Sequence, residues 1–532
     1  MGSFWKQGEP QVWGTAAALS ITLLMVATLI GVVMLNGLGF FWPSDTVLVS
    51  LKDGTKLLGE ITETEKGTKT QGERIQFKVG NRDLYGQDFR WIDKQDIASS
   101  SYPDNAVVLE RKESGNFYGF LKALNRNGQQ LTASATPWEQ LLTEWESVTQ
   151  AEERLDILRT KMSKLNSAAE IHRLKIQKLS FHDRTSNRKE IEGLTDKREK
   201  LLTEFNGIME ELNNKTAELN QVTALFEDAS GEEKEIALTT IVRAYRPNTM
   251  GFFAKAAFYA GKVKELLVGE PRESNTEGGL FPAIFGTVLM VLFMSIFSLP
   301  FGVIAAIYLR EYAKEGLLVR IVRIAVNNLA GVPSIVYGVF GLGFFIYGLG
   351  SGIDQLFYPE RLPTPTFGTG GILWASLTLA LLTVPVVIVS TEEGLASVPK
   401  GLRQGSLSLG ATKFQTLIKI VLPMATPGIM TGMILAMARA AGEVAPLMLV
   451  GVVKLAPTLP IDGQFPFFHL DRKFMHLGFH IFDVGFQSPN VEAAKPMVFV
   501  TTLLLLAIVI TASSTAIYLR NKMKKKYATK AF

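Results

Sequence analysis

Arg439 and Glu443 are the two residues of this sequence whose types and spacing best suit the binding of an anion. They lie four positions apart in an apolar run, from about 427 to 453, that is predicted to be helical. Side chains four apart share a helix face, and charges inside such a run usually face a bundle interior or a wet cavity. The planar guanidinium of an arginine can hold two oxygens of an oxyanion, and a nearby carboxylate weakens that grip. An interhelical ion pair without a substrate role is the alternative.

Other kinds of chemistry lack the residues that they need. The 532 residues include five His and no Cys, which excludes disulfides, thiolate zinc sites, iron–sulfur clusters and cysteine nucleophiles. The sequence contains neither a G-x-x-x-x-G-K-[ST] phosphate loop nor an H-E-x-x-H motif, and its Ser, His and Asp residues form no hydrolase pattern. We therefore expect no catalytic residue, no metal site and no cofactor bound by this chain.

The composition is that of an integral membrane protein with a large water-soluble insert. Hydrophobic residues make up 47% of the chain and charged residues 20%, and the mean hydropathy is +0.18. The formal charge of +5 does not indicate nucleic-acid binding, because basic loops are expected beside membrane segments. Six apolar runs reach the roughly 20 residues that a membrane-crossing helix needs. They are 13–41, 280–309, 324–349, 370–390, 427–453 and 497–519.

The distribution of Lys and Arg predicts the orientation in the membrane. Basic residues gather after the second, fourth and sixth runs, and basic loops stay in the cytoplasm. Both termini are therefore predicted to be cytoplasmic, and residues 43–279 and 454–495 extracytoplasmic. The first run is long and ends in Phe40, Phe41 and Trp42, which favours a retained helix over a cleaved signal peptide.

Three patterns follow one another in the insert. Residues 45–127 are strand-like, with Asp53-Gly54 as a hairpin turn signal, and predict a small β-barrel or sandwich. Heptads between about 138 and 222, interrupted by the polar stretch 181–187, predict an antiparallel coiled-coil hairpin. Residues 252–267 are aromatic and basic, which indicates a helix on the bilayer surface or, equally, a soluble packing helix.

These patterns divide the chain into six parts. The predicted parts are an N-terminal transmembrane helix at 1–42, a small extracytoplasmic β domain at 43–136, a coiled-coil hairpin at 137–226, an interfacial linker at 227–279, a core with five transmembrane helices at 280–520, and a basic cytoplasmic tail at 521–532.

The loop between the fourth and fifth apolar runs carries a helix–turn–helix pattern. A short helix around 402–409 is predicted to end at Gly410, which is a good C-cap residue. A second helix is predicted to begin near Ala411 and to stop by Pro423. A protruding pair of this kind suits docking into a groove of a soluble partner; a plain cytoplasmic linker is the alternative.

This loop resembles the E-A-A-x3-G-x9-I-x-L-P loop of bacterial ABC-importer permeases, which sits in a cleft of the separate ATPase subunit. Four residues fall at the family's positions: Gly410, Ile420, Leu422 and Pro423. The family's E-A-A triplet is replaced by three others: Gln404, Gly405 and Ser406. The resemblance implies that these seven residues couple the chain to an ATPase, while any contact made by the family's Glu is in doubt.

Two further stretches resemble phosphate-specific permeases. Residues 327–338 read Asn-Asn-Leu-Ala-Gly-Val-Pro-Ser-Ile-Val-Tyr-Gly, and residues 439–446 read Arg-Ala-Ala-Gly-Glu-Val-Ala-Pro. The whole segment from about 279 to 522 resembles PstA-type phosphate transport permeases, and the insert resembles the enlarged amino-terminal domain of some bacterial versions. This implies an all-α polytopic membrane protein of the type I importer kind, with six transmembrane helices. It adds Asn327 and Asn328 to the expected substrate path.

The resemblance implies a function and a set of partners. The chain would be a permease subunit of an ATP-driven phosphate importer in the bacterial inner membrane, in contact with membrane lipid. A homologous second permease, two copies of an ATP-binding subunit that uses the ATP, and an extracytoplasmic phosphate-binding protein would complete the assembly. Moving an anion into a negative interior costs about 2.3 kcal/mol per charge per 100 mV, so import needs an energy source. The alternatives are import of sulfate or molybdate, or a membrane-anchored scaffold or sensor that uses the coiled-coil insert.

Overall fold

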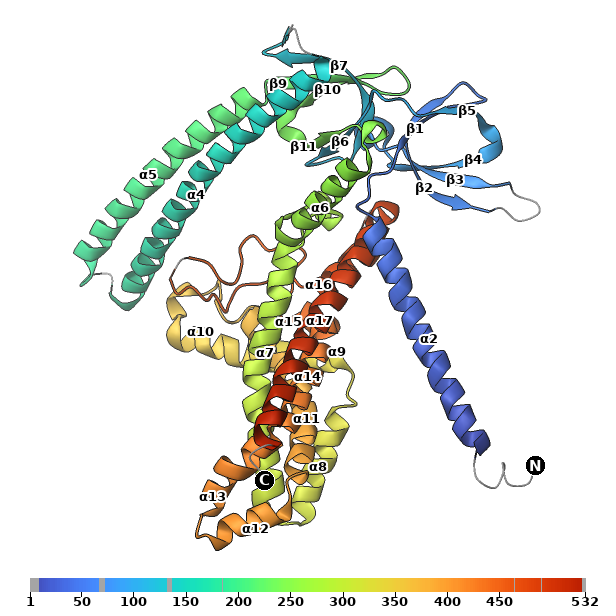
Figure 1. The fold of residues 1–532 in the computed structure, drawn as a ribbon. Coiled ribbons are helices and arrows are strands. Elements are labelled where there is room, and N and C mark those ends of the chain that lie inside the picture. The colour runs from blue at the N-terminus through green and yellow to red at the C-terminus, as the bar shows by residue number, and fades with distance from the viewer. Residues whose placement is uncertain are drawn as a thin grey trace.

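The computed structural model describes residues 9–66, 72–131, 136–183, 185–463, 465–488 and 490–528. A bundle of membrane helices forms one part of the molecule, and two β-sheets with a long helical hairpin form the other (Figure 1). Six helices in the described residues are long and apolar enough to cross a membrane, so the predicted helical core with six candidate spans and an added β region is confirmed. The spans are Gln11–Gly39, Phe281–Tyr312, Ser334–Phe357, Ile372–Ala396, Lys413–Gly442 and Val491–Lys525.

The first β-sheet follows the strand pattern of the sequence. It is antiparallel, in the order β4-β3-β2-β1-β5. Gly54, in the turn between β1 and β2, has a φ of +88°, a conformation that favours glycine, so the predicted Asp53-Gly54 hairpin is confirmed. Side chains on one face, among them Val47, Val49 and Phe77, form the core of the sheet. The strands are β1 Thr46–Leu51, β2 Lys56–Glu65, β3 Arg74–Lys78, β4 Phe89–Asp93 and β5 Ile97–Ser101.

The second sheet extends further along the chain than the sequence predicts. Its order is β10-β9-β7-β6-β11, and β8 pairs with β7. The strand prediction ends at residue 127, just before the two-residue β8. It misses β9, β10 and β11, because β9 pairs with β7 across the whole hairpin and local patterns do not reveal such a pairing. These strands fall in residues given to the coiled coil and the linker; the six-part division itself stays a prediction. The strands are β6 Ala106–Arg111, β7 Phe117–Arg126, β8 Gln129–Gln130, β9 Val222–Glu227, β10 Glu233–Ala237 and β11 Ile241–Tyr245.

The long helical hairpin is inserted into this second sheet, between β8 and β9. It consists of α4 (Pro137–Asp183) and α5 (Arg188–Leu219), which lie side by side (Figure 1). The first turns of α4 belong to the sheet core, because Leu141 and Val148 are buried there and the Trp145 indole donates to the carbonyl of Ile241 at 2.9 Å. The two helices are therefore confirmed, and their coiled-coil packing stays a prediction.

Helix α6 (Phe252–Val268) connects the sheets to the membrane bundle. One of its faces packs on the β region, where the Phe258 ring lies 4.5 Å from that of Tyr245. Phe252 and Phe253 at its start remain 70% and 87% exposed. The predicted helix is confirmed, and it has one packed and one exposed face. Its contact with the bilayer stays a prediction.

Helix α11 (Ile372–Ala396) lies at the centre of the bundle, between α7 (Phe281–Ile307) and α14 (Leu422–Gly442). Glycines let α11 and α14 approach closely: a Cβ on Gly428 would lie 2.5 Å from the Cα of Gly394. Small residues serve this purpose in membrane helices. The other elements are η5 Tyr308–Tyr312, α8 Leu317–Leu329, α9 Ser334–Phe340, η6 Gly341–Gly350, α10 Ser351–Phe357, η7 Pro359–Arg361, α12 Lys400–Ser408, α13 Lys413–Thr416, η8 Leu417–Val421, α15 Ala445–Val450, α16 Leu477–Phe482 and α17 Val491–Ala528.

The first and the last membrane helix, α2 (Glu9–Gly39) and α17, lie near the two ends of the chain. Helix α2 packs on α17, and it splays from the rest of the bundle (Figure 1). Helix α17 continues to Ala528, so most of the predicted basic tail extends the last span as a helix. Residues 529–532 of that tail and residues 1–8 lie outside the described residues.

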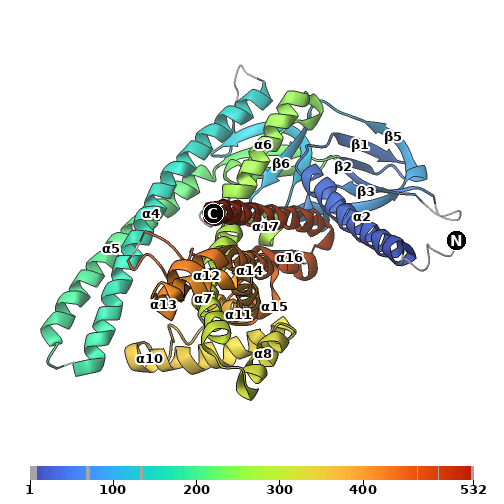
Figure 2. The ribbon, with the colours of Figure 1, turned by 60° about the horizontal axis from the view of Figure 1, so that its bottom comes forward.

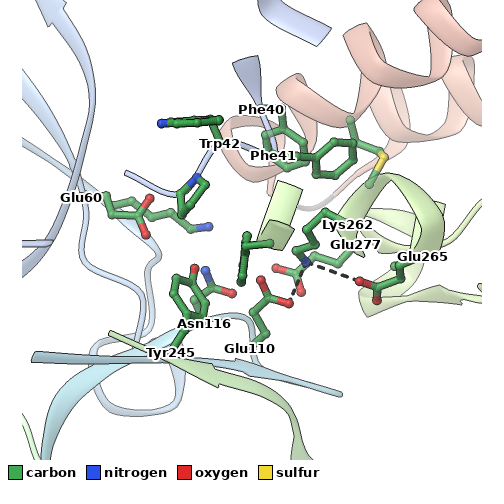
Figure 3. A pocket seen from close by; sticks show the side chains of 15 residues that line it. Phe40, Phe41, Trp42, Glu60, Glu110, Asn116, Tyr245, Lys262, Glu265 and Glu277 are labelled. Carbon is green, nitrogen blue, oxygen red and sulfur yellow. Dashed lines mark hydrogen bonds and ion pairs between the residues drawn. The ribbon is translucent and has the colours of Figure 1, made fainter. Parts of the chain in front are cut away.

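A charged cavity lies where α2, both sheets and α6 meet (Figure 3). Phe40, Phe41 and Trp42 form its apolar wall, and opposite them the Lys262 ammonium lies 2.6 Å from Glu110. Burial raises the pKa of Glu60, whose carboxylate accepts a hydrogen bond from the Tyr118 hydroxyl at 2.9 Å. Burial likewise raises the pKa of Glu277. The cavity therefore holds two half-buried carboxylates, Glu60 and Glu277, whose negative charge opposes folding.

Replacing Glu60 by Gln should stabilise this junction at neutral pH. A carboxyl group whose pKa is raised by folding destabilises the protein above that pKa, and the loss is relieved as pH falls through it. Glu60→Gln removes the charge and keeps an acceptor for Tyr118. The protection factors of the β1–β3 amides against hydrogen exchange should be higher in the variant at pH 7.5, and they should change less between pH 7.5 and 5. Glu63→Gln, at a 56% exposed side chain on the same strand, is the control; equal effects of both changes would contradict the prediction.

Candidate functional site

The third apolar run is broken in the middle. A continuous helix over 324–349 is predicted, but α8 ends at Leu329 and α9 begins at Ser334. The N–H of Gly331 turns back to the carbonyl of Asn328 at 3.0 Å. Pro333 explains the break, because a proline disfavours helical conformation in the residue before it. The predicted continuous helix is therefore wrong; Ser334–Phe357 is the part of this run that is by itself long and apolar enough to cross a membrane.

The fifth apolar run is broken as well. Helix α14 ends at Gly442, and Glu443 is extended, with φ −78° and ψ 129°. The expectation that Arg439 and Glu443 share one helix face is therefore wrong, because Glu443 lies outside both helices. The next helix, α15, begins only at Ala445, with Pro446 in its first turn. Their side chains still meet, because the extended residue folds back: Arg439 Nε lies 3.4 Å from Glu443 Oε1.

This ion pair leaves most of the arginine available. Only Nε of Arg439 donates to Glu443, and within the described parts of the chain neither terminal nitrogen has a protein acceptor. The side chains of Arg439 and Glu443 are 32% and 18% exposed. A guanidinium with two free terminal nitrogens can bind two oxygens of an oxyanion in parallel, so the geometry permits anion binding at Arg439 without breaking the pair.

The structure brings the two broken segments together. Helix α9 packs on α15, and a Cβ on Gly338 would lie 2.7 Å from the Cα of Pro446. Gly338 ends one of the two stretches singled out in the sequence and Pro446 ends the other. Two breaks about 110 residues apart in the chain therefore belong to one region of the bundle.

Asn327 and Asn328 lie at the end of α8 and are exposed. Neither makes a hydrogen bond or ion pair with Arg439 or Glu443 in the described structure, so the four predicted path residues form no single cluster of contacts. Sequence reasoning missed Tyr337, which is 5% exposed and donates from its hydroxyl to the carbonyl of Leu329 at 2.7 Å. Its place in the same stretch was the available signal. The phenol bridges the break and fixes the end of α8 relative to α9.

The helix–turn–helix is confirmed at its first turn. Helix α12 ends just before Gly410, whose φ is +86°. The Gly410 N–H donates to the carbonyl of Leu407, and the Ala411 N–H to that of Ser406, the two bonds of a Schellman motif. Thr412 and Gln415 then cap the next helix reciprocally. The Ser406 and Thr416 hydroxyls lie 2.8 Å apart and join the two arms.

The second arm does not stop by Pro423, as the sequence suggested. Residues Lys413–Gly442 form one continuous apolar helix, which passes through a π-helical stretch at Leu417–Val421. Pro423 lies in the first turn of α14, where a missing N–H is tolerated. Ile420, Leu422 and Pro423 therefore belong to this through-going helix.

The turn presents an apolar surface away from the bundle. Leu409 is 91% and Phe414 63% exposed, and Gln404, Gly405 and Gly410 are exposed beside them. On the other side, Arg403 pairs with Glu311 at 2.5 Å, and the Lys413 ammonium lies 4.8 Å from the centre of the Tyr312 ring. The turn is thus held against the end of the second span while its apolar tip remains uncovered.

Comparisons with known proteins cover this part of the chain. Residues 298–525 match the family described as "Binding-protein-dependent transport system inner membrane component". The chain is 40% identical over 175 residues to the phosphate transport system permease protein PstA of Mycobacterium leprae, covering 33% of this chain and 52% of that protein. It is 30% identical over 223 residues to the "Probable ABC transporter permease protein YqgI" of Bacillus subtilis, covering 41% and 70%. The chain thus spans about half the length of the first relative. A solved structure of the inward-facing MetNI methionine ABC transporter is 18% identical with a TM-score of 0.33, covering 46% of this chain and 94% of that chain.

The matched residues contain both helix breaks and the helix–turn–helix. Proteins of this family are membrane components of transporters and not enzymes, in agreement with the sequence, which offers no catalytic group. With six candidate spans and these matches, the chain belongs to the binding-protein-dependent inner membrane components, the permease subunits of ABC transporters.

Proposed function

We propose that this chain is a permease subunit of an ATP-driven phosphate importer and forms half of its translocation path. The observation that carries the proposal is the meeting of two broken membrane segments beside Arg439, whose terminal nitrogens have no protein acceptor in the described structure. The similarity to phosphate permeases over the same residues supports phosphate as the substrate. Sulfate and molybdate are the competing oxyanions.

The exposure of the first break supports its place in the path. Irregular backbone at membrane depth is tolerated only where protein buries it or where it lines a water-filled cavity. Residues 328–331 are exposed on this chain. We therefore infer that this face turns toward a second, homologous permease and the path between the two subunits, and not toward lipid. Broken helices that expose helix ends at the midplane are a common way to build substrate sites in transporters.

In this proposal Glu443 weakens the binding of the anion at Arg439. A phosphate carries between one and two negative charges near neutral pH, and an unpaired arginine would hold it too tightly for release. The carboxylate 3.4 Å from Nε competes for the same charge. The pair can therefore bind an oxyanion for a short time, as transport requires, with Asn327 and Asn328 further along the path.

The helix–turn–helix couples the chain to a separate ATPase. Its uncovered apolar tip, with Leu409 and Phe414, suits a groove on a soluble subunit. The seven residues expected to couple therefore act in two ways: those in and before the turn, 404–410, shape the docking surface, while 420–423 belong to the helix behind it. Two copies of the ATPase would serve two permeases, and a phosphate-binding protein would deliver substrate on the opposite side, where residues 43–279 lie in the proposed topology.

Replacing Arg439 by Gln should abolish phosphate uptake while the complex still assembles. The neutral amide fits the helix but cannot hold two oxygens of an anion with a positive fork. ATP-dependent uptake of labelled phosphate into vesicles that contain the complete complex measures the effect, and a loss of more than tenfold is expected. An excess of unlabelled sulfate or molybdate added to the same vesicles should not reduce wild-type uptake.

Two further variants separate this role from a structural one. Arg520→Gln removes an arginine that donates to Thr431 from α17 and should leave uptake intact. If the pair is only structural, Arg439→Gln should lower membrane yield first, and the double change with Glu443→Gln should restore both yield and transport. Recovery of transport in the double variant would therefore contradict the substrate site.

Replacing Gly410 by Val should uncouple transport from ATP hydrolysis. The φ of +86° at Gly410 is unfavourable for a β-branched residue, although no neighbouring atom obstructs a Cβ. The turn should distort without a steric clash, so uptake should fall several-fold while the protein still reaches the membrane. Gly401→Val is the matched control, since Gly401 also has open space around it but lies within α12. Normal uptake by Gly410→Val in an intact complex would refute the coupling role.

A further inference from the structure

The distal part of the helical hairpin reaches the end of a membrane span. The side-chain amide of Gln177 on α4 donates to the carbonyl oxygen of Glu360. Glu360 lies only three residues after Phe357, the last residue of the third candidate span. Figures 1 and 2 both place the free end of the hairpin beside α10 (Ser351–Phe357), beyond the other helices of the bundle. The hairpin thus extends from the second sheet to the level at which this span leaves the bilayer.

The end of the hairpin lies beside α10, at the edge of the bundle (Figures 1 and 2). Leu356 and Phe357 are 77% and 67% exposed, as expected of residues that face lipid at the edge of the bundle. Helix α4 continues for six residues past Gln177, about 9 Å at 1.5 Å per residue. The distal end of α4 therefore extends beyond its contact with the end of the third span.

Charge is unevenly distributed along the hairpin. We define the hairpin tip as residues 173–200. It contains nine Lys and Arg against five Asp and Glu, whereas the rest of α4 and α5 contains five basic against eleven acidic residues. The basic end is the one that lies beside the end of the third candidate span.

The exposed side chains of the tip combine basic and aromatic character. Lys175, Lys178 and Lys189 are exposed, the Arg188 side chain is 80% exposed, and Phe181 is 57% exposed. Basic residues near an anionic bilayer are attracted to it electrostatically, and an aromatic ring among them suits the headgroup level. The combination matches the surface of a bilayer that contains anionic phospholipid.

We propose that the hairpin tip binds anionic phospholipid headgroups on the bilayer surface next to the third span. The hairpin is then attached at both ends, to the second sheet at its base and to the lipid surface at its tip. Because both ends are attached, it fixes the distance of the β region from the membrane. This is independent of the transported substrate, so the proposal stands or fails separately from phosphate import.

A single-cysteine label can test the position of the tip, because the chain has no Cys of its own. Ser186→Cys places a fluorophore in the turn and Ser163→Cys places one farther up α4. The full chain is reconstituted in nanodiscs of phosphatidylcholine, with or without 30% phosphatidylglycerol, and a quencher is attached to a fraction of the headgroups. We expect the label at 186 to be quenched at least twofold more in the anionic discs, and the label at 163 to be quenched equally in both.

Charge-neutralising variants identify the residues responsible. Changing Lys175, Lys178, Arg188 and Lys189 to Gln should abolish the difference between the two lipids at position 186. The matched control changes four basic residues of α4 outside the tip, Arg154, Arg159, Lys161 and Lys164, and should preserve it. Equal quenching in both lipids, or no effect of the tip variant, would overturn the proposal. Quenching that appears only when an acidic soluble partner is added would also overturn it, in favour of a protein docking site.

Discussion

The need to satisfy every backbone hydrogen bond inside the bilayer governs the membrane half of this protein. The six membrane helices satisfy their backbone hydrogen bonds internally. The backbone groups at the breaks, at 330–333 and after Gly442, lack helical partners, so neighbouring protein or water has to bind them. Tyr337 supplies part of that at the first break by donating to the carbonyl of Leu329, and the close contact of Gly338 with Pro446 buries part of both. The constraint that forces the spans to be helical therefore makes the two breaks the best indication of where the substrate path lies.

The continuity of the fifth span connects the two proposed functional regions. Residues Lys413–Gly442 form one helix of about 45 Å at 1.5 Å per residue. One end begins at the capped turn that carries Leu409 and Phe414, and the other ends with Arg439 and the extended Glu443. This helix therefore joins the two regions directly, through the π-helical stretch at Leu417–Val421 and past Pro427. The glycine contact between α11 and α14, at Gly394 and Gly428, lets the two helices pack closely against each other.

The sequence predicted the membrane spans, the first sheet, the hairpin helices and the turn at Gly410, because each depends on local periodicity or on a residue with a special conformation. It did not predict the ends of the broken segments. Pro333 and Gly442 mark them, but apolar composition continues across both breaks and hides them. It also missed β9–β11, whose pairing with β7 depends on contacts far apart in the chain. Arg439 and Glu443 were singled out by their charge, and their role stays a prediction, whereas Tyr337 was missed because an aromatic residue in an apolar run looks like a core residue.

The insertion of the hairpin between β8 and β9 also sets an order of events during synthesis. Strand β7 ends at Arg126 and its neighbour β9 begins at Val222, so roughly 95 residues must be made between them. At about 5–20 residues per second, β7 waits some 5 to 20 s for its partner. The first sheet, whose strands are all complete by Ser101, can close during that time. The strands of the first sheet are thus synthesised first and the two hairpin helices next. The three strands that complete the second sheet follow, and α6 and the remaining five spans are synthesised last.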